Sequence, residues 1–503
     1  MSSTAFVHAS GAGGFSSMLT VGSGGSSDST DATVSGGTRS SASKLSLGSS
    51  SSTTRAVTSG GASGTTRLTA TGGGSNARAA TGGMATTGGQ SSSASAQKGD
   101  LVCDLPAPSA FSSNSKLGGG GTQYKESDHF IVFGASNPDA VLRMLEAAHQ
   151  CFVEDWCWRS TGLSITSNSG TYFKTNVYSK PSLGAGGYMQ YDATAGLSYL
   201  EILASQIGLA QVTVHEYGHA LTLAAKGWVD QTNTGFWWES VANFVADTFI
   251  TSSYCESARS NFGIPAGNTI IELDRVYGLP HTVICNDQNY YQAWPFLTYL
   301  TNNPDNYPGL GRMVLPDMFR LHKGNNETPL HVLARIASPV TVQTILGRYW
   351  ARMAYLDIGH PKAQQAFLSG RQRLNFAANL DSASGQMFKV KANRQPQYGG
   401  ANINPLRVTG DGAINVRVTN LGNGLQESNF TATLAIRAEM GDVRYVDLPG
   451  GSGETQVASG EEVSLVVVNT PDTVYMYNPE RVGSPENVGL NYEVQLIGAV
   501  PSS

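Results

Sequence analysis

The sequence predicts an α+β protein in which a small mixed sheet and a set of helices precede a C-terminal β-sandwich. Strand-like segments alternate with helical periodicity between residues 127 and 250, helices dominate after Cys285, and alternating strands follow Met387. The chain of 503 residues is long enough for two packed units and a tail. We predict the boundaries 1–122 for the tail, 123–385 for the first unit and 386–503 for the sandwich.

The N-terminal segment has a composition that cannot build a core. Ser, Gly, Thr and Ala dominate it from Met1 to about Gln97, with repeated Thr-Gly-Gly and Ser-Gly-Gly pieces, and a second glycine run follows at 118–121. Large apolar side chains are too few there to offset the entropy lost on ordering. We therefore expect a disordered tether over 1–122.

The first unit is predicted to begin with a strand. A short β-type run bounded by turn residues is followed by an amphipathic helix that starts at Asn137-Pro138-Asp139. Two further strand-like segments and two apolar helices come next. In order, the expected elements are a strand at 127–134, a helix at 137–156, strands at 171–178 and 186–192, and helices at 200–225 and 236–250.

The rest of the chain changes from helical to strand-like texture. Helical spacing is seen at 290–300, 311–321 and 342–355. Short alternating segments then occur at 413–418, 432–437, 463–468 and 492–496, separated by Gly, Asn, Asp and Pro. Such a series predicts a small β-sandwich, of the kind often appended to secreted enzymes.

Charge and hydropathy exclude two classes of partner. The net charge is −5 and the isoelectric point is near 6.0, without a long basic run, so we expect no nucleic-acid partner. Nothing approaches the roughly 18 consecutive apolar residues of a membrane span, so no transmembrane segment is expected. Small-molecule, peptide or protein substrates fit this composition better.

Five cysteines lie at 103, 151, 157, 255 and 285, and no two form a CxxC pair. Disulfides are therefore favoured over a zinc ribbon, and buried free thiols remain the alternative. Cys151 and Cys157 flank one helix end, and Cys255 and Cys285 bracket a loop, but the connectivity cannot be read from sequence. Disulfides favour a secreted or cell-envelope-associated protein. The first 25 residues show no clear signal peptide.

The motif that carries chemistry is His215-Glu216-Tyr217-Gly218-His219, an HExxH core in an apolar helical stretch. On a helix, His215 and His219 share one face and can bind one metal ion, with Glu216 beside it. A catalytic zinc ion needs a third protein ligand, and Glu239 on the next helix is placed to supply it. The alternatives are an incidental His pair on an exposed helix and, for Glu239, a carboxylate favoured by the helix dipole.

These residues resemble the gluzincins, the thermolysin-like zinc metallopeptidases, over 127–250. The Trp237-Trp238-Glu239 segment and the strand-rich tail further resemble an uncharacterised family of secreted gluzincin-like proteins from bacteria and fungi. The resemblance implies a zincin-like domain with zinc bound by His215, His219 and Glu239. It implies Glu216 as the general base.

The same resemblance implies an oxyanion donor downstream of the ligands and an edge strand for the substrate. Candidates for the donor are Tyr290, Tyr291 and His281, and the segment from Gly186 to Tyr191 is the candidate strand. In thermolysin-like enzymes an aspartate four residues after the glutamate ligand holds a ligand histidine. This chain has Asn243 there, and Asp247, one turn further on, is a possible substitute.

Three functions remain open from the sequence. The first is a secreted zinc metallopeptidase. The second is a zinc-binding but catalytically inactive relative, whose β-sandwich binds a protein or a cell-envelope or extracellular glycan. The third is a zinc hydrolase of another bond. The sequence favours the first.

Overall fold

The computed structural model describes residues 107–422 and 429–502. Most of the expected tether and Cys103 lie outside the described residues. Phe111 and Leu117 are buried, so packed structure begins earlier than the expected boundary at residue 123. The described residues belong to one compact unit.

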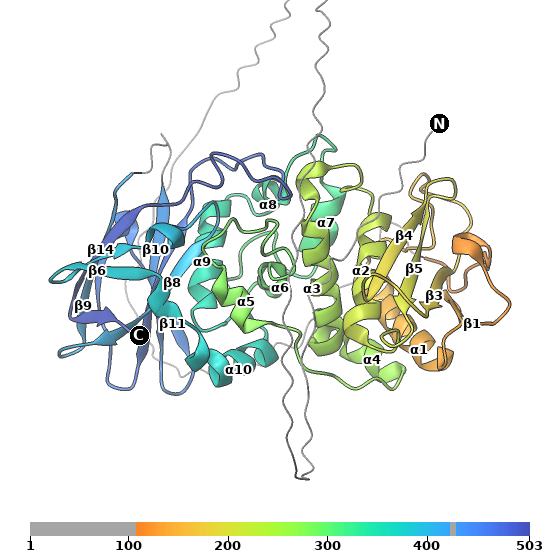
Figure 1. Cartoon of the computed structure of the whole chain (residues 1–503), viewed down its shortest axis with the longest axis horizontal. Coiled ribbons are helices and arrows are strands. Elements are labelled where there is room, and N and C mark those ends of the chain that lie inside the picture. Colours follow the sequence, from red (N-terminus) through yellow and green to blue (C-terminus); the bar gives the residue numbers. More distant parts are fainter. Residues whose placement is uncertain (1–106, 423–428, 503) are drawn as a thin grey trace, which may run out of the picture. The chain divides into compact units, whose positions relative to one another are not determined.

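The first sheet is mixed and has five strands in the order β1-β2-β3-β5-β4 (Figure 1). Its three central strands run parallel, and the two outer strands are antiparallel to their neighbours. Within the described part of the chain, β4 therefore lies at an edge of the sheet and pairs with β5 alone. The strands are β1 (Tyr124–Glu126), β2 (Phe130–Phe133), β3 (Thr175–Lys180), β4 (Gly187–Asp192) and β5 (Leu197–Leu203).

One sequence expectation is wrong at this sheet. The helix expected to start at Leu200 begins instead at Ala210, because Leu197–Leu203 forms β5. Leu200 and Ile202 are buried while Tyr199 and Glu201 between them are partly exposed, which is the alternation of a half-buried strand. Over so short a segment, apolar residues at alternate positions also fit part of a helical pattern, so the sequence does not separate the end of β5 from the start of α2.

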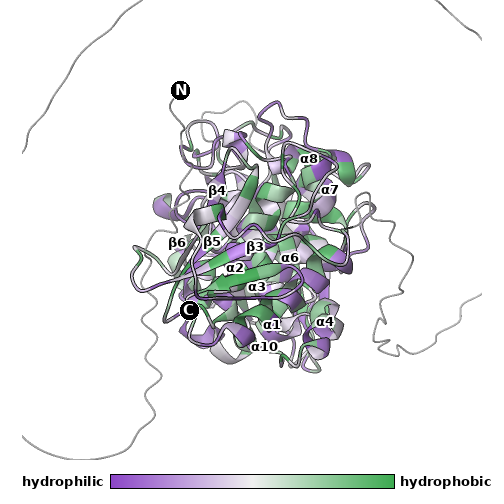
Figure 2. Cartoon of the chain, turned by 90° about the vertical axis from the view of Figure 1, so that its right-hand side faces the viewer, coloured by the Kyte–Doolittle hydropathy of each residue, from purple (hydrophilic) through white to green (hydrophobic). Residues whose placement is uncertain are grey.

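Two helices, α1 and α2, pack beside this sheet, and α3 packs against α2. The helix α1 (Pro138–His149) starts where Asn137 caps it by accepting a hydrogen bond from the N–H of Ala140, and it continues into a π-helical turn at Gln150–Glu154. The helices α2 (Ala210–Ala224) and α3 (Trp237–Thr251) are buried along nearly their whole length, and Figure 2 shows hydrophobic residues gathered in the interior of this side of the molecule and hydrophilic residues around its rim.

The central part of the chain is helical. The predicted helices at 290–300, 311–321 and 342–355 correspond to α6, α7 and α9 with shifted ends. The other four helices, α4, α5, α8 and α10, are not among the predicted ones. Among the described residues, none of the helices combines the length and apolar character that a membrane crossing requires. The helices are α4 (Glu256–Asn261), α5 (Leu273–Gly278), α6 (Trp294–Asn302), α7 (Val314–Arg320), α8 (Pro329–Ile336), α9 (Val342–Met353) and α10 (Pro361–Gly370).

The C-terminal part contains two antiparallel five-stranded sheets that share an apolar core. Their strands begin at Leu380, a few residues before the expected boundary at 386. One sheet has the order β11-β10-β13-β8-β15 and the other β12-β9-β14-β7-β6. The strands are β6 (Leu380–Ser384), β7 (Met387–Val390), β8 (Ala401–Val408), β9 (Ala413–Asn420), β10 (Phe430–Arg437), β11 (Val443–Asp447), β12 (Ser452–Gln456), β13 (Glu462–Asn469), β14 (Tyr492–Ile497) and β15 (Ala499–Pro501).

The first of these sheets also packs on the helices through its other face. Ala435, Val466 and Val468 join the main core, which includes residues of α9. The contact is close, because a Cβ atom on Gly347 of α9 would lie 2.6 Å from Oγ1 of Thr431 on β10. A continuous apolar core therefore joins this sheet of the sandwich to the helical part of the chain.

The cysteines pair across long distances in the chain. Cys151 bonds to Cys255, at a separation of 104 residues, and ties the end of α1 to the segment after α3. Cys157 is also disulfide-bonded. Cys285 is a free, buried thiol beside the hydroxyl of Ser240. Sequence neighbourhood alone, which grouped Cys151 with Cys157 and Cys255 with Cys285, does not describe the pairing.

Candidate metal centre

The two histidines of the HExxH motif lie on one face of α2. Their ring centroids are 4.8 Å apart and the ring planes are nearly perpendicular, at 87°. Both side chains are almost fully buried. This is the arrangement expected of positions i and i+4 on a helix, and it directs two imidazole nitrogens at one point.

Glu239 meets these histidines from the first turn of α3. Its Oε2 atom lies 3.2 Å from Nε2 of His215 and 3.3 Å from Nε2 of His219. Burial by itself raises the pKa of Glu239, but the two imidazoles outweigh it and hold that pKa well below the ordinary value. The positive end of the helix dipole favours the same ionised form. The alternative of a dipole-placed carboxylate is thus compatible with a ligand role.

The three side chains fit a zinc ion. A tetrahedral zinc ion with bonds of about 2.0–2.1 Å separates its ligand atoms by about 3.3 Å, close to the two distances above. Glu239 Oε2 is buried and accepts no hydrogen bond of ordinary geometry from the described residues. An ionised oxygen buried in this state is costly unless a cation binds it. Two imidazoles and a carboxylate form the donor set of a catalytic zinc site.

Asn243 contacts the first candidate ligand, His215. Its Oδ1 atom is 2.8 Å from Nδ1 of His215, and its Nδ2 atom donates to the carbonyl of Tyr291 at 2.8 Å. Because the amide nitrogen is used by the Tyr291 carbonyl, the amide oxygen must face His215, and Nδ1 of His215 carries the proton. In the neutral ring, Nε2 of His215 then carries the lone pair and is the atom directed towards Glu239.

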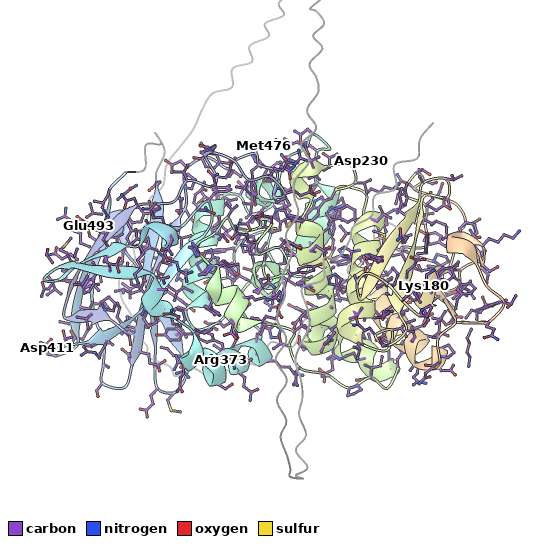
Figure 3. All side chains as sticks on the ribbon, viewed as in Figure 1. Lys180, Asp230, Arg373, Asp411, Met476 and Glu493 are labelled. Carbon is purple, nitrogen blue, oxygen red and sulfur yellow. A yellow bond between two sulfur atoms is a disulfide. The ribbon has the colours of Figure 1, made fainter. Side chains whose placement is uncertain are left out.

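Glu216 lies beside the three ligand residues without belonging to them. Burial raises the pKa of Glu216, although the two histidines and the backbone N–H of Met189 act in the opposite direction. Both Glu216 and Glu239 are under 5% exposed, in contrast to peripheral acids such as Asp230 and Asp411 (Figure 3). Buried carboxylates with shifted pKa values are typical of functional sites.

The three candidates for an oxyanion donor occupy different places. Tyr291 lies at the metal centre, with its ring 6.1 Å from that of His215, and burial followed by the charge of Glu239 raises its pKa well above the ordinary value. Tyr290 stacks on Phe236 at 4.2 Å. His281 bonds to Arg394, and no contact among the described residues joins it to the ligands.

Asp247 does not substitute for the missing aspartate. Its carboxylate is 2.5 Å from Nε2 of His360 and also accepts hydrogen bonds from Thr269 and Ile270. Asn243 already occupies the position beside His215. The expectation that Asp247 holds a ligand histidine is therefore wrong, because its partner lies 113 residues further along the chain.

The edge strand β4 reaches the centre more closely than sequence reasoning indicated. A Cβ atom on Gly187 would lie 2.6 Å from Cγ of Glu216, and the Met189 N–H faces the Glu216 carboxylate. The strand itself was predicted, but the contact with Glu216 was not. The glycine at its start is the only sequence signal for so close an approach.

Comparison with known proteins identifies a family, but the function of that family is unknown. No curated protein matches the sequence. The M60 catalytic domain of ZmpC from Clostridium perfringens, solved in complex with the sialyl T antigen, is similar at 12% identity and a TM-score of 0.29, over 76% of this chain and 69% of that chain. So low a score leaves fold and activity to be argued from the residues of this chain. Residues 119–503 match DUF6055, a family of unknown function, and the chain therefore belongs to that family.

Proposed function

We propose that this protein is a zinc-dependent metallopeptidase that hydrolyses peptide bonds. The observation that carries the proposal is the convergence of Nε2 of His215 and Nε2 of His219 on Oε2 of Glu239, with Glu216 beside them. A zinc ion bound there would lower the pKa of a water molecule towards neutrality and polarise a carbonyl group. The resemblance of the HExxH segment to gluzincins supports the same reaction.

Glu216 is the general base of the proposed reaction. Its carboxylate is not needed as a ligand, and its raised pKa makes it a better proton acceptor than an exposed glutamate. It takes the proton of the attacking water and delivers it to the leaving amine. The hydroxyl of Tyr291, whose raised pKa keeps it protonated, donates a hydrogen bond to the carbonyl oxygen as negative charge develops.

The strand β4 aligns the substrate. Among the described strands it pairs only with β5, so its other edge carries no strand, and an extended peptide can be added on that side. The close approach of Gly187 to Glu216 brings that edge to the reacting centre. An edge that offers alternating N–H and C=O groups favours a peptide over a small-molecule substrate.

A secreted or cell-envelope-associated location accompanies this function. The disulfide between Cys151 and Cys255 supports this location, because such bonds persist in oxidising compartments.

One residue favours the second candidate function, a zinc-binding but catalytically inactive relative of the peptidases. Asn243 is uncharged, and it raises the basicity of His215 less than an aspartate does.

The Glu216→Gln variant tests the proposal. The purified chain is digested against an unbiased peptide library, with and without a chelator, and its zinc content is measured in parallel. We expect the wild type to cleave peptides in a chelator-sensitive way, and E216Q to keep zinc but lose cleavage. Glu256→Gln, an exposed carboxylate on α4, is the matched control.

Two outcomes would contradict the proposed peptidase function. Equal cleavage by wild type and E216Q would remove Glu216 as the base. Zinc binding without cleavage by either protein would favour the inactive relative.

A further inference from the structure

A second cluster of metal-binding side chains lies on the other side of α2 from the zinc ligands. His129 precedes β2, His149 is the last residue of α1, and Glu154 ends the π-helical turn that follows. Potential ligand atoms of these three residues all lie within 4.8 Å of one another, as do those of the proposed zinc centre. Two imidazoles and one carboxylate again form the set.

The two imidazoles are buried, and each has one nitrogen in use. Nδ1 of His129 is 2.6 Å from Oε2 of Glu146, and Nδ1 of His149 is 3.2 Å from the hydroxyl of Tyr217. The Nε2 atoms of both rings are inaccessible to solvent and have no hydrogen-bond partner among the described residues. Leaving two neighbouring polar atoms unsatisfied in a core is costly.

The partners of the Nδ1 atoms determine what the Nε2 atoms present. An ionised carboxylate only accepts, so Glu146 fixes the proton of His129 on Nδ1 and leaves the lone pair of the neutral ring on Nε2. His149 is also almost fully buried, and burial favours the uncharged form of its ring. The Tyr217 hydroxyl can accept a hydrogen bond as well as donate one, so Nδ1 of His149 can carry the proton and give the same tautomer.

We propose that His129, His149 and Glu154 bind a second divalent metal ion of the zinc class. Imidazole nitrogens with one carboxylate suit zinc and the neighbouring transition metals better than magnesium or calcium. Such an ion gives both orphaned nitrogens a partner. The Glu146–His129 pair is then the carboxylate–histidine–metal arrangement that orients ligands in known metal sites.

Binding requires a local change in the two rings. They are stacked, with centroids 3.9 Å apart and planes at 15°, so their Nε2 lone pairs point nearly in parallel. The rings must turn apart to share one ion, which sacrifices a weak stacking contact for metal–ligand bonds. Glu154 is exposed and sits on a π-helical turn, so it can reorient to complete the site.

The second ion would have a structural role that reaches the HExxH helix. It ties the start of β2 to the end of α1, and the bond from His149 to Tyr217 continues to α2. Tyr217 lies between Glu216 and Gly218 and is buried on the side of α2 away from the zinc ligands. The ion would therefore stabilise the face of α2 that lies opposite His215 and His219.

Equilibrium dialysis of the full chain against ZnCl2, with metal content measured per chain, tests the proposal. We expect two zinc ions in the wild type, one in H215Q/H219Q and one in H149Q. In the H215Q/H219Q background the remaining ion should raise the melting temperature. Adding Glu154→Gln should weaken this ion about tenfold or more. Glu154 is exposed, so its substitution should not disturb folding, and E154Q tests the site even if H149Q fails to fold. The control is Glu256→Gln, which replaces another exposed glutamate.

The proposal is wrong if the wild-type chain binds a single zinc ion and H215Q/H219Q binds none. It is also wrong if, in the H215Q/H219Q background, E154Q and E256Q bind zinc with equal affinity. Neither result depends on peptide cleavage, so the second site and the peptidase activity can fail separately.

Discussion

Gly218 on α2 lies directly against Ala242 on α3, at the point where the two helices cross. A Cβ atom on Gly218 would be 2.8 Å from Cα of Ala242 and 3.1 Å from Cβ of Val245. Gly218 stands between the two histidines in the sequence, so the two helices approach each other closely beside the candidate metal centre. This contact is what allows Glu239, on one helix, to reach both histidines on the other.

Replacing Gly218 with alanine should therefore weaken zinc binding as well as the fold. The added methyl group must push α3 outwards, which costs about 1–3 kcal/mol in a packed core and lengthens the distances from Glu239 to the histidines. Zinc affinity by dialysis and the free energy of unfolding in urea are the two measurements. Gly208→Ala is the control, because a Cβ atom there would meet nothing within 4 Å. If G218A matched G208A in both, the crossing would not position the ligand.

The parts of this site that the sequence predicts are those set by local helix geometry. His215 and His219 share a face because they are four residues apart, and Asn243 follows Glu239 by the same interval. The observed bond between Asn243 and His215 then requires only that α2 and α3 pack together. No long-range information is needed beyond that single contact.

What the sequence does not predict depends on contacts between distant segments. Asp247 faces His360 and Cys151 bonds to Cys255, partners separated by more than one hundred residues. His129 and His149 carry no motif, because one precedes a strand and the other ends a helix. The misassigned start of α2 has another cause, since apolar residues at 200 and 202 fit either a strand or a helix when taken alone.

Two substitutions at Asn243 should act in opposite directions. Asn243→Ala removes the acceptor for Nδ1 of His215 and frees the ring to change tautomer, so zinc affinity should fall about 10–100-fold. Asn243→Asp supplies a charged acceptor and should raise affinity above that of the wild type. Competition with a chromogenic chelator measures both. Equal affinities in the three proteins would mean that Asn243 does not orient His215.

Gly187→Ala should separate zinc binding from catalysis. The new Cβ atom would lie 2.6 Å from Cγ and 2.9 Å from Oε1 of Glu216, so the carboxylate must move. The ligands are not touched, and zinc content should stay at the wild-type level while the rate of peptide cleavage falls at least tenfold. A drop in kcat with little change in zinc content is the expected result. Unchanged cleavage would show that Glu216 tolerates displacement and is not the base.

Acid stability should depend on Glu327, a buried carboxylate far from the metal centre in sequence. Both of its oxygens accept hydrogen bonds from Arg335 at 2.7 Å, and the N–H of Lys323 donates to one of them. Burial alone raises the pKa of Glu327, but these donors lower it to about 2.

A pKa below the ordinary value of 4.5 means that this contribution to stability is complete above pH 4.5 and is lost as the pH falls towards 2. We expect Glu327→Gln to reduce the free energy of unfolding by about 2–3 kcal/mol at pH 7, and the difference from wild type to shrink steadily below pH 4.5. Urea unfolding at several pH values measures it. Asp274→Asn, which breaks an exposed pair with Arg373, should have little effect at any pH. A gap that stayed constant down to pH 2 would show that the charge of Glu327 does not stabilise the fold.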